Sequence, residues 1–146
     1  LPNKQQVRYW FTVFGVLLLL SELLSYSLVK YEPHEFMTSA YTTADPLWLL
    51  WIAMVVAAPI FEELFFRGFL LEGFRHTFMG ATGTVLLTSL LWAVIHTQYD
   101  LYYIITIFVM GGVLGMARAQ TGSVILPIGL HAFVNGLATL QTGYFV

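Results

Sequence analysis

The motif Glu62-Glu63-x-x-x-Arg67 places three ionisable side chains within a strongly apolar stretch of the chain. A charged side chain at the centre of a bilayer costs about 2.5–3.5 kcal/mol on insertion scales, so these residues need partners or a function. Glu63 and Arg67 are four positions apart with the acid first, which favours an intrahelical ion pair. Glu62 is rotated from Glu63 by about 100° on a helix and faces another direction. We predict that Glu63 and Arg67 position the helix and that Glu62 is free for chemistry.

A second group of polar residues lies farther along the chain, again in apolar surroundings. His96 ends an apolar stretch, and His131 and Asn135 are four positions apart, hence on one face of a helix. Each could be explained separately, because a buried histidine or asparagine often only bonds a neighbouring helix. One shared polar cavity explains all of them more simply. We therefore expect these three residues and Glu62 to line one cavity inside the membrane.

Most known strategies for hydrolysis inside a membrane lack their required residues here. The sequence has no Cys and no HExxH motif, which removes a thiol nucleophile and a zinc-binding histidine pair on one helix. Asp45 and Asp100 fall in expected connections, so they do not form a buried pair that shares a proton. Ser89 lies seven residues before His96, too far for the direct hydrogen bond that activates a serine. What remains is water activated by glutamate and histidine.

In that chemistry each candidate has a role. Glu62 and His96 can hold a water molecule and remove its proton as it attacks a carbonyl carbon. His131 and Asn135 can donate hydrogen bonds to the oxyanion that develops. Carboxylate and imidazole groups also surround catalytic zinc, so Glu62, His96 and His131 form an alternative metal-binding set. We expect the metal-free version, with no cofactor.

Three short motifs resemble those of a known protease family. Glu62-Glu63-Leu-Phe-Phe-Arg67 resembles the EExxxR motif of the CAAX protease and bacteriocin-processing family, which includes the type II CAAX prenyl endopeptidases. Trp92-Ala-Val-Ile-His96 resembles its FxxxH motif, with Trp in place of Phe, and His131-Ala-Phe-Val-Asn135 resembles its HxxxN motif. The resemblance extends over residues 59–136, and the order of the three motifs makes it specific.

The resemblance implies an intramembrane endopeptidase of the glutamate type, built as a helical bundle around a conical cavity open to one membrane face. It implies the same roles for Glu62, His96, His131 and Asn135, and it places Glu63 and Arg67 at the fixed positions of the first motif. The substrate would be a peptide or protein, cleaved near a C-terminal or leader segment. Two other functions stay open: a proton- or ion-coupled carrier, and a non-enzymatic membrane scaffold or immunity protein.

Composition indicates which elements position these residues. The chain has 146 residues, of which 58% are hydrophobic and 10% charged, far below the 25% charged residues of a soluble domain. We predict an all-α, polytopic transmembrane bundle of about five helices. The expected spans cover residues 10–29, 47–71 with an extension to 74, 84–95, 101–117 and 124–139, and Tyr31 to Pro46 is expected to be an exposed loop. Residues 1–146 are interpreted as one membrane-embedded domain, with the protease-like core at about 47–141.

Local details refine this picture. Pro59 should kink the second span just before the acidic pair, and Gly111 and Gly115 should let helices approach closely. The third span is too short to cross a bilayer, so residues 97–100 should border the cavity at depth. Glu72, Arg75 and His76 are expected on a solvated or interfacial face, His34 in the exposed loop, and Tyr99, Tyr102 and Tyr103 in an interfacial aromatic belt.

The charges suggest location and partners. Lys4, Arg8, Arg75 and Arg118 lie on one side of the expected spans, against Lys30 on the other, which favours a cytoplasmic N-terminus. We expect an integral protein of a bacterial plasma membrane, with the first span retained rather than cleaved as a signal peptide. The first residue is Leu, so the sequence is expected to be trimmed or partial. A net charge of −2 without a basic run excludes nucleic acid as a partner; the lipid bilayer is the expected partner.

Overall fold

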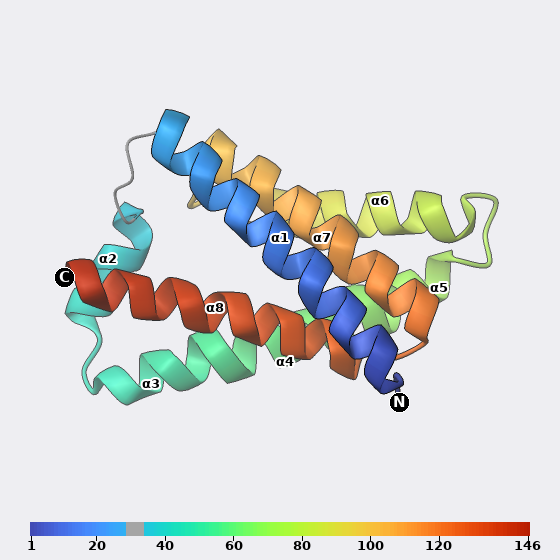
Figure 1. Cartoon of the computed structure of the whole chain (residues 1–146), viewed down its shortest axis with the longest axis horizontal. Helices are drawn as coiled ribbons and strands as arrows, with labels where there is room; N and C mark the ends of the chain where they lie inside the picture. Colours follow the sequence, from blue (N-terminus) through green and yellow to red (C-terminus); the bar gives the residue numbers. More distant parts are fainter. Residues whose placement is uncertain (29–33) are drawn as a thin grey trace.

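The computed structural model describes residues 1–28 and 34–146, and in this part of the chain every regular element is a helix (Figure 1). Some adjoining helical segments merge, so that six continuous helices result. In chain order they are α1 (Lys4–Leu28), α2 (Glu35–Thr43), the long helix Leu47–Phe74, α6 (Gly80–Val94), α7 (Leu101–Thr121) and α8 (Ile125–Phe145). The predicted all-α bundle is confirmed, and each of the five expected helices is present.

The distribution of side chains is that of an integral membrane protein. Within residues 1–28 and 34–146, three helices are long and apolar enough to cross a membrane: Lys4–Ser27, Leu47–Phe74 and Leu101–Thr121. Large apolar side chains such as Leu19, Phe61 and Leu86 point outward and are exposed, whereas polar side chains such as Thr84 and Thr88 are fully buried. An apolar outer surface can be covered by lipid tails, whereas its exposure to water would cost free energy.

The long helix changes its winding on both sides of the acidic pair. It consists of α3 (Leu47–Trp51), the π-helical η1 (Ile52–Ala57), α4 (Ala58–Glu63), the π-helical η2 (Leu64–Leu70) and α5 (Leu71–Phe74). Pro59 lies at the start of α4, and because proline has no N–H, the regular hydrogen bond to the preceding turn cannot form there. π-helical turns are rare in proteins and, where they occur, often lie at functional sites. Glu62 and Glu63 thus lie on one short α-helical turn between two wider ones.

Close packing of α6 against α7 depends on two glycines, as predicted. A Cβ atom added at Gly111 would lie 3.0 Å from the Trp92 ring, and one added at Gly115 would lie 2.9 Å from a Val85 methyl. Both distances are too short for ordinary contact, so glycine is required if the two helices are to keep this separation. α6 has only 15 residues and is about 22 Å long, which confirms that it is too short to cross the bilayer core.

The prediction of an exposed loop from Tyr31 to Pro46 was wrong. Residues 35–43 form the helix α2, and Met37 within it is buried. The side chain of His34 caps this helix by accepting a hydrogen bond from the backbone N–H of Phe36, which stabilises its first turn. Lys30 and the beginning of the expected loop lie outside the described residues.

Four helix ends also differ from the expected ones. α1 begins at Lys4 instead of Trp10. α6 begins at Gly80 instead of Thr84, and α8 continues to Phe145 instead of ending at Thr139. α7 continues through Arg118, where a turn was expected, and ends before Gly122. Gly122 has φ +66° and its N–H bonds to the carbonyl of Arg118, the left-handed geometry that ends many helices. Polar residues near these ends obscured the boundaries in the sequence.

Candidate functional site

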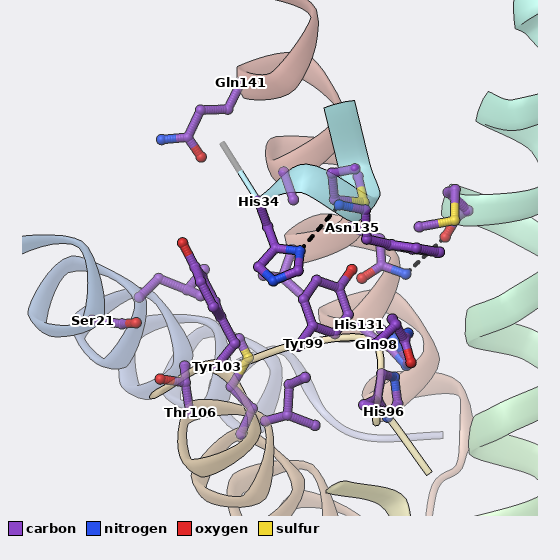
Figure 2. A pocket seen from close by; sticks show the side chains of 18 of the residues that line it. Ser21, His34, His96, Gln98, Tyr99, Tyr103, Thr106, His131, Asn135 and Gln141 are labelled. Atoms are coloured by element: carbon purple, nitrogen blue, oxygen red, sulfur yellow. Dashed lines mark hydrogen bonds between the residues drawn. The ribbon is translucent and has the colours of Figure 1, made fainter. Parts of the chain in front are cut away.

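One cavity of about 320 Å³ is lined by all four residues that the sequence identified as catalytic candidates. Glu62 reaches it from α4, His96 from the connection after α6, and His131 and Asn135 from α8. The predicted shared cavity is therefore present, and Figure 2 shows three of these residues around it. His96, Gln98 and Tyr99 all line the cavity, so the connection between α6 and α7 borders it as expected.

The predicted ion pair between Glu63 and Arg67 is also present. Arg67 Nη1 donates to Glu63 Oε1 at 2.9 Å, and both side chains are fully buried. Arg67 Nη2 also donates to the carbonyl of Gly111 on α7 at 3.2 Å, and its guanidinium lies 4.6 Å from the centre of the Trp92 ring. A buried charge is tolerated when it is paired and hydrogen-bonded. This pair thus joins the long helix to α6 and α7.

His131 bonds the same oxygen of Glu63. Its Nδ1 lies 2.9 Å from Glu63 Oε1. Because a carboxylate oxygen can only accept, the hydrogen of this bond is on Nδ1. The other ring nitrogen, Nε2, therefore carries a hydrogen only when the imidazole is protonated. The sequence did not predict this contact, because His131 and Glu63 are 68 positions apart.

Glu62 faces a different partner from Glu63, as its rotation on the helix predicted. Its Oε2 accepts a hydrogen bond from the indole Nε1 of Trp92 at 2.5 Å. Among the described residues no hydrogen bond reaches the other carboxylate oxygen, Oε1. One oxygen of Glu62 is thus held by protein and the other is available to a molecule in the cavity.

His96 is oriented by the backbone of α6, the helix that precedes it. Its Nδ1 lies 2.7 Å from the carbonyl oxygen of Trp92, so Nδ1 must donate and the neutral ring has its lone pair on Nε2. The rings of His96 and His131 lie 5.3 and 5.1 Å from the Trp92 ring, both nearly perpendicular to it. The rings of both histidines therefore contact Trp92, although His96 follows α6 and His131 belongs to α8.

Asn135 is bound to the backbone of the long helix. Its Nδ2 donates to the carbonyl oxygen of Met54 in η1 at 2.8 Å. An amide group carries two N–H donors, so one of them remains for a ligand. The bond also fixes which amide atom is the nitrogen, because a carbonyl oxygen needs a donor.

The cavity extends beyond the four candidates to residues that sequence reasoning missed. Figure 2 shows His96 and His131 on one side, Ser21, Tyr103 and Thr106 on the other, and His34 and Tyr99 between them. Other polar residues that line this part are Glu22, Ser25, Tyr102 and Gln141. The sequence could have identified Glu22 as a cavity residue, because it is an ionisable residue within an apolar span, as Glu62 is.

His34 and the tyrosines correct two expectations. The side chain of His34 is only 14% exposed, and its ring lies 4.8 Å from Tyr99 and 5.3 Å from Tyr103. Tyr99, Tyr102 and Tyr103 line the cavity instead of only forming an interfacial belt. No periodicity in the sequence places His34 here, because its position depends on how α2 packs against α8.

Glu72, Arg75 and His76 lie outside this cavity, as expected. Arg75 and Arg118 both bond Glu72, at 2.9 and 3.2 Å, and these side chains are partly exposed. Arg118 Nε also donates to the carbonyl of Arg67 at 3.2 Å. This group therefore ties the end of α7 to η2 and α5, and it does not contribute to the candidate site.

Glu62, His96 and His131 were predicted as an alternative zinc-binding set. Among the described residues no group of three or more histidine, aspartate and glutamate side chains is arranged to hold a metal ion. Glu62 directs one oxygen to Trp92, and His131 is turned toward Glu63. A catalytic zinc site needs three convergent ligands, and no such group is present among the described residues.

Comparison with known proteins agrees with the motifs. Residues 44–137, well over half of the chain, match the family model described as type II CAAX prenyl endopeptidase Rce1-like. An uncharacterized 24.3 kDa protein of Escherichia coli is 32% identical over 113 residues, which cover 72% of this chain and 50% of that protein. The protein YyaK of Bacillus subtilis is 25% identical over 142 residues, covering 91% of this chain and 46% of that protein.

A third relative matches a shorter part of the chain. The UPF0177 protein YbdI of Lactococcus lactis is 42% identical over 53 residues, covering 36% of this chain and 27% of that protein. No solved structure matches the chain significantly. The chain spans about half the length of the curated relatives that match most of it.

Proposed function

Because the chain belongs to the type II CAAX prenyl endopeptidase Rce1-like family, we propose that it is an intramembrane endopeptidase of the glutamate type. The observation that carries the proposal is the shared cavity, in which Glu62 and three side chains from two other parts of the chain face one space of about 320 Å³. Four polar residues inside a membrane are costly one by one. Together they supply the base and the hydrogen-bond donors that peptide hydrolysis needs.

In the proposed mechanism a water molecule binds between Glu62 and His96. Oε1 of Glu62 and the lone pair on His96 Nε2 can each accept one of its hydrogen atoms. The water oxygen attacks the carbonyl carbon of the substrate while Glu62 takes the proton. The C–N bond then breaks as that proton passes to the leaving amine, so the products are a new carboxyl group and a new amino terminus.

His131 and Asn135 stabilise the oxyanion in this proposal. Asn135 donates its second N–H, because the first is bonded to Met54. Donation from His131 Nε2 requires the protonated ring, since Nδ1 already donates to Glu63. A protonated His131 together with Arg67 and Glu63 would give this group one net positive charge, which complements a developing negative charge.

We also propose a membrane location and an orientation for the protein. The N-terminus and the C-terminal end of α7 are on the same side of the molecule in Figure 1, so Lys4 and Arg8 lie toward the end that carries Arg118. Positive residues favour the cytoplasmic side, which supports a cytoplasmic N-terminus in a bacterial plasma membrane. Since the sequence has no Cys, a single cysteine introduced at Asn3 can be tested for labelling from either side.

The proposed activity is tested by comparing the N-termini of membrane proteins in cells that make either the wild-type protein or Glu62→Gln. We expect new N-termini that depend on Glu62, and their sequences identify the substrate as a C-terminal or a leader segment. His96→Ala should abolish the same cleavages. If both variants fold and keep the full biological effect of the wild type, the protein is a carrier or a scaffold and the proposal is wrong.

A further inference from the structure

Trp92 contacts both of the residues to which the activation of water is assigned. Its indole Nε1–H donates to Glu62 Oε2, and its backbone carbonyl accepts from His96 Nδ1. The side chain is only 3% exposed, yet it lines the cavity through the small part that is accessible. One residue on α6 thus lies between the proposed base on the long helix and the histidine that follows α6.

We propose that Trp92 is a positioning residue that holds the Glu62 carboxylate in its catalytic orientation through the indole N–H. This inference rests on the proposed function of Glu62. Trp92 would not contact the substrate carbonyl or the water itself. It would act by occupying one oxygen of Glu62, so that the other oxygen faces the cavity.

Glu62 needs such a partner, because nothing else among the described residues fixes its carboxylate by a hydrogen bond. The side chain is half-buried at the cavity wall and has several rotatable bonds. A displacement of about 1 Å at a reacting group can cost roughly 10²-fold in rate. A hydrogen bond from a rigid ring is therefore an effective way to keep Glu62 in place.

The ring of Trp92 is itself held on two sides. The guanidinium of Arg67 lies 4.6 Å from its centre, and the backbone of α7 approaches it so closely that a Cβ atom at Gly111 would lie 3.0 Å from the ring. Arg67 is bonded in turn to Glu63. The two acids of the motif are thus connected through Arg67 and Trp92, and the indole N–H is fixed before any substrate binds.

A purely structural role for Trp92 is the competing interpretation, since the ring packs in the core beside Phe66 and Met110. That role requires the shape of the ring but not its N–H. The resemblance to the FxxxH motif sharpens the distinction, because a phenylalanine would pack here and could not donate. The decisive change therefore removes the N–H and keeps the ring.

Two replacements of Trp92 in the otherwise unchanged protein make this test. The first is 3-benzothienylalanine, in which sulfur replaces the indole N–H at nearly the same shape, and the second is Trp92→Phe. The assay uses a quenched fluorescent peptide that contains a Glu62-dependent cleavage site found in membranes, with thermal unfolding measured in parallel. We expect both variants to lower kcat by roughly 10- to 100-fold with little change in KM, and the first to unfold at the wild-type temperature.

Several results would overturn the inference. If the benzothienylalanine variant cleaves at the wild-type rate, the N–H does not position Glu62, even if Trp92→Phe fails to fold. If the benzothienylalanine variant unfolds, the N–H has a structural role instead. The proposed function fails separately, when the wild-type protein shows no cleavage that depends on Glu62.

A second measurement examines the hydrogen bond between Trp92 and Glu62 independently of catalysis. The chain has four tryptophans, so labelling with ¹⁵N on the indole nitrogen gives four resolvable N–H signals in detergent micelles. Glu62→Ala should shift the Trp92 signal and increase its exchange with water, while the signals of Trp10, Trp48 and Trp51 stay unchanged. An unchanged Trp92 signal would show that the hydrogen bond is absent in the folded protein.

Discussion

His131 Nδ1 lies 2.9 Å from Glu63 Oε1, the same oxygen that accepts the hydrogen bond from Arg67. Glu63 is therefore the common partner of an ion pair on its own helix and of a histidine on α8. Glu62, one position earlier, bonds Trp92 instead. The two adjacent acids thus have separate environments, one fully buried and one at the cavity wall, and this separation leads to different expected effects when each is replaced.

Glu63→Gln should destabilise the fold, whereas Glu62→Gln should mainly remove activity. Replacing Glu63 leaves Arg67 buried without a counter-charge, which costs about 3–5 kcal/mol. Glu62 is partly exposed to the cavity and pairs with no cation among the described residues, so Gln at this position should unfold close to the wild-type temperature. Thermal unfolding in detergent and the cleavage assay measure the two effects. Equal melting temperatures for the two variants would contradict the assignment.

Asn135→Ala should lower kcat by about 10²–10³, the usual cost of losing an oxyanion donor. Asn135→Asp has nearly the same shape but offers the Met54 carbonyl an acceptor where a donor is needed, so it should be at least as inactive and also less stable. Thr139→Ser is the matched control, because Thr139 lies one turn farther along α8 and does not line the cavity. Full activity of Asn135→Ala would remove this residue from the mechanism.

Gly111→Ala should destabilise the protein and reduce its activity, while Gly112→Ala should do neither. A methyl group at Gly111 would meet Trp92, Ser89 and Arg67 at 3.0–3.2 Å, and overpacking of this kind typically costs about 1–3 kcal/mol. At Gly112 nothing lies within 4 Å of the added atom, and alanine is the better helix former. Unfolding temperatures and cleavage rates of the two variants, compared side by side, check this prediction.

The purified protein should remain active after treatment with a zinc chelator. The proposed mechanism uses no metal, and among the described residues no group of three or more histidine, aspartate and glutamate side chains could hold a metal ion. Elemental analysis and the cleavage assay before and after chelation measure this. Stoichiometric zinc together with lost activity, restored when zinc is added back, would refute the metal-free mechanism.

The sequence alone determined the class of the fold and the identities of the four candidate residues. Apolar runs of membrane-spanning length require helices, because a bilayer offers the backbone no other hydrogen-bond partners. The ionisable residues within those runs are conspicuous because their burial is costly. Even the pairing of Glu63 with Arg67 followed from helical periodicity, since both residues lie on one helix.

Only the tertiary structure decided which residues meet across helices. The bond from Trp92 to Glu62 and the bond from His131 to Glu63 join positions 30 and 68 residues apart, and no local spacing encodes such contacts. The same holds for His34, whose position in the cavity wall depends on the packing of α2 against α8. Local rules identify residues that need a partner, but the packing of the helices selects the partner.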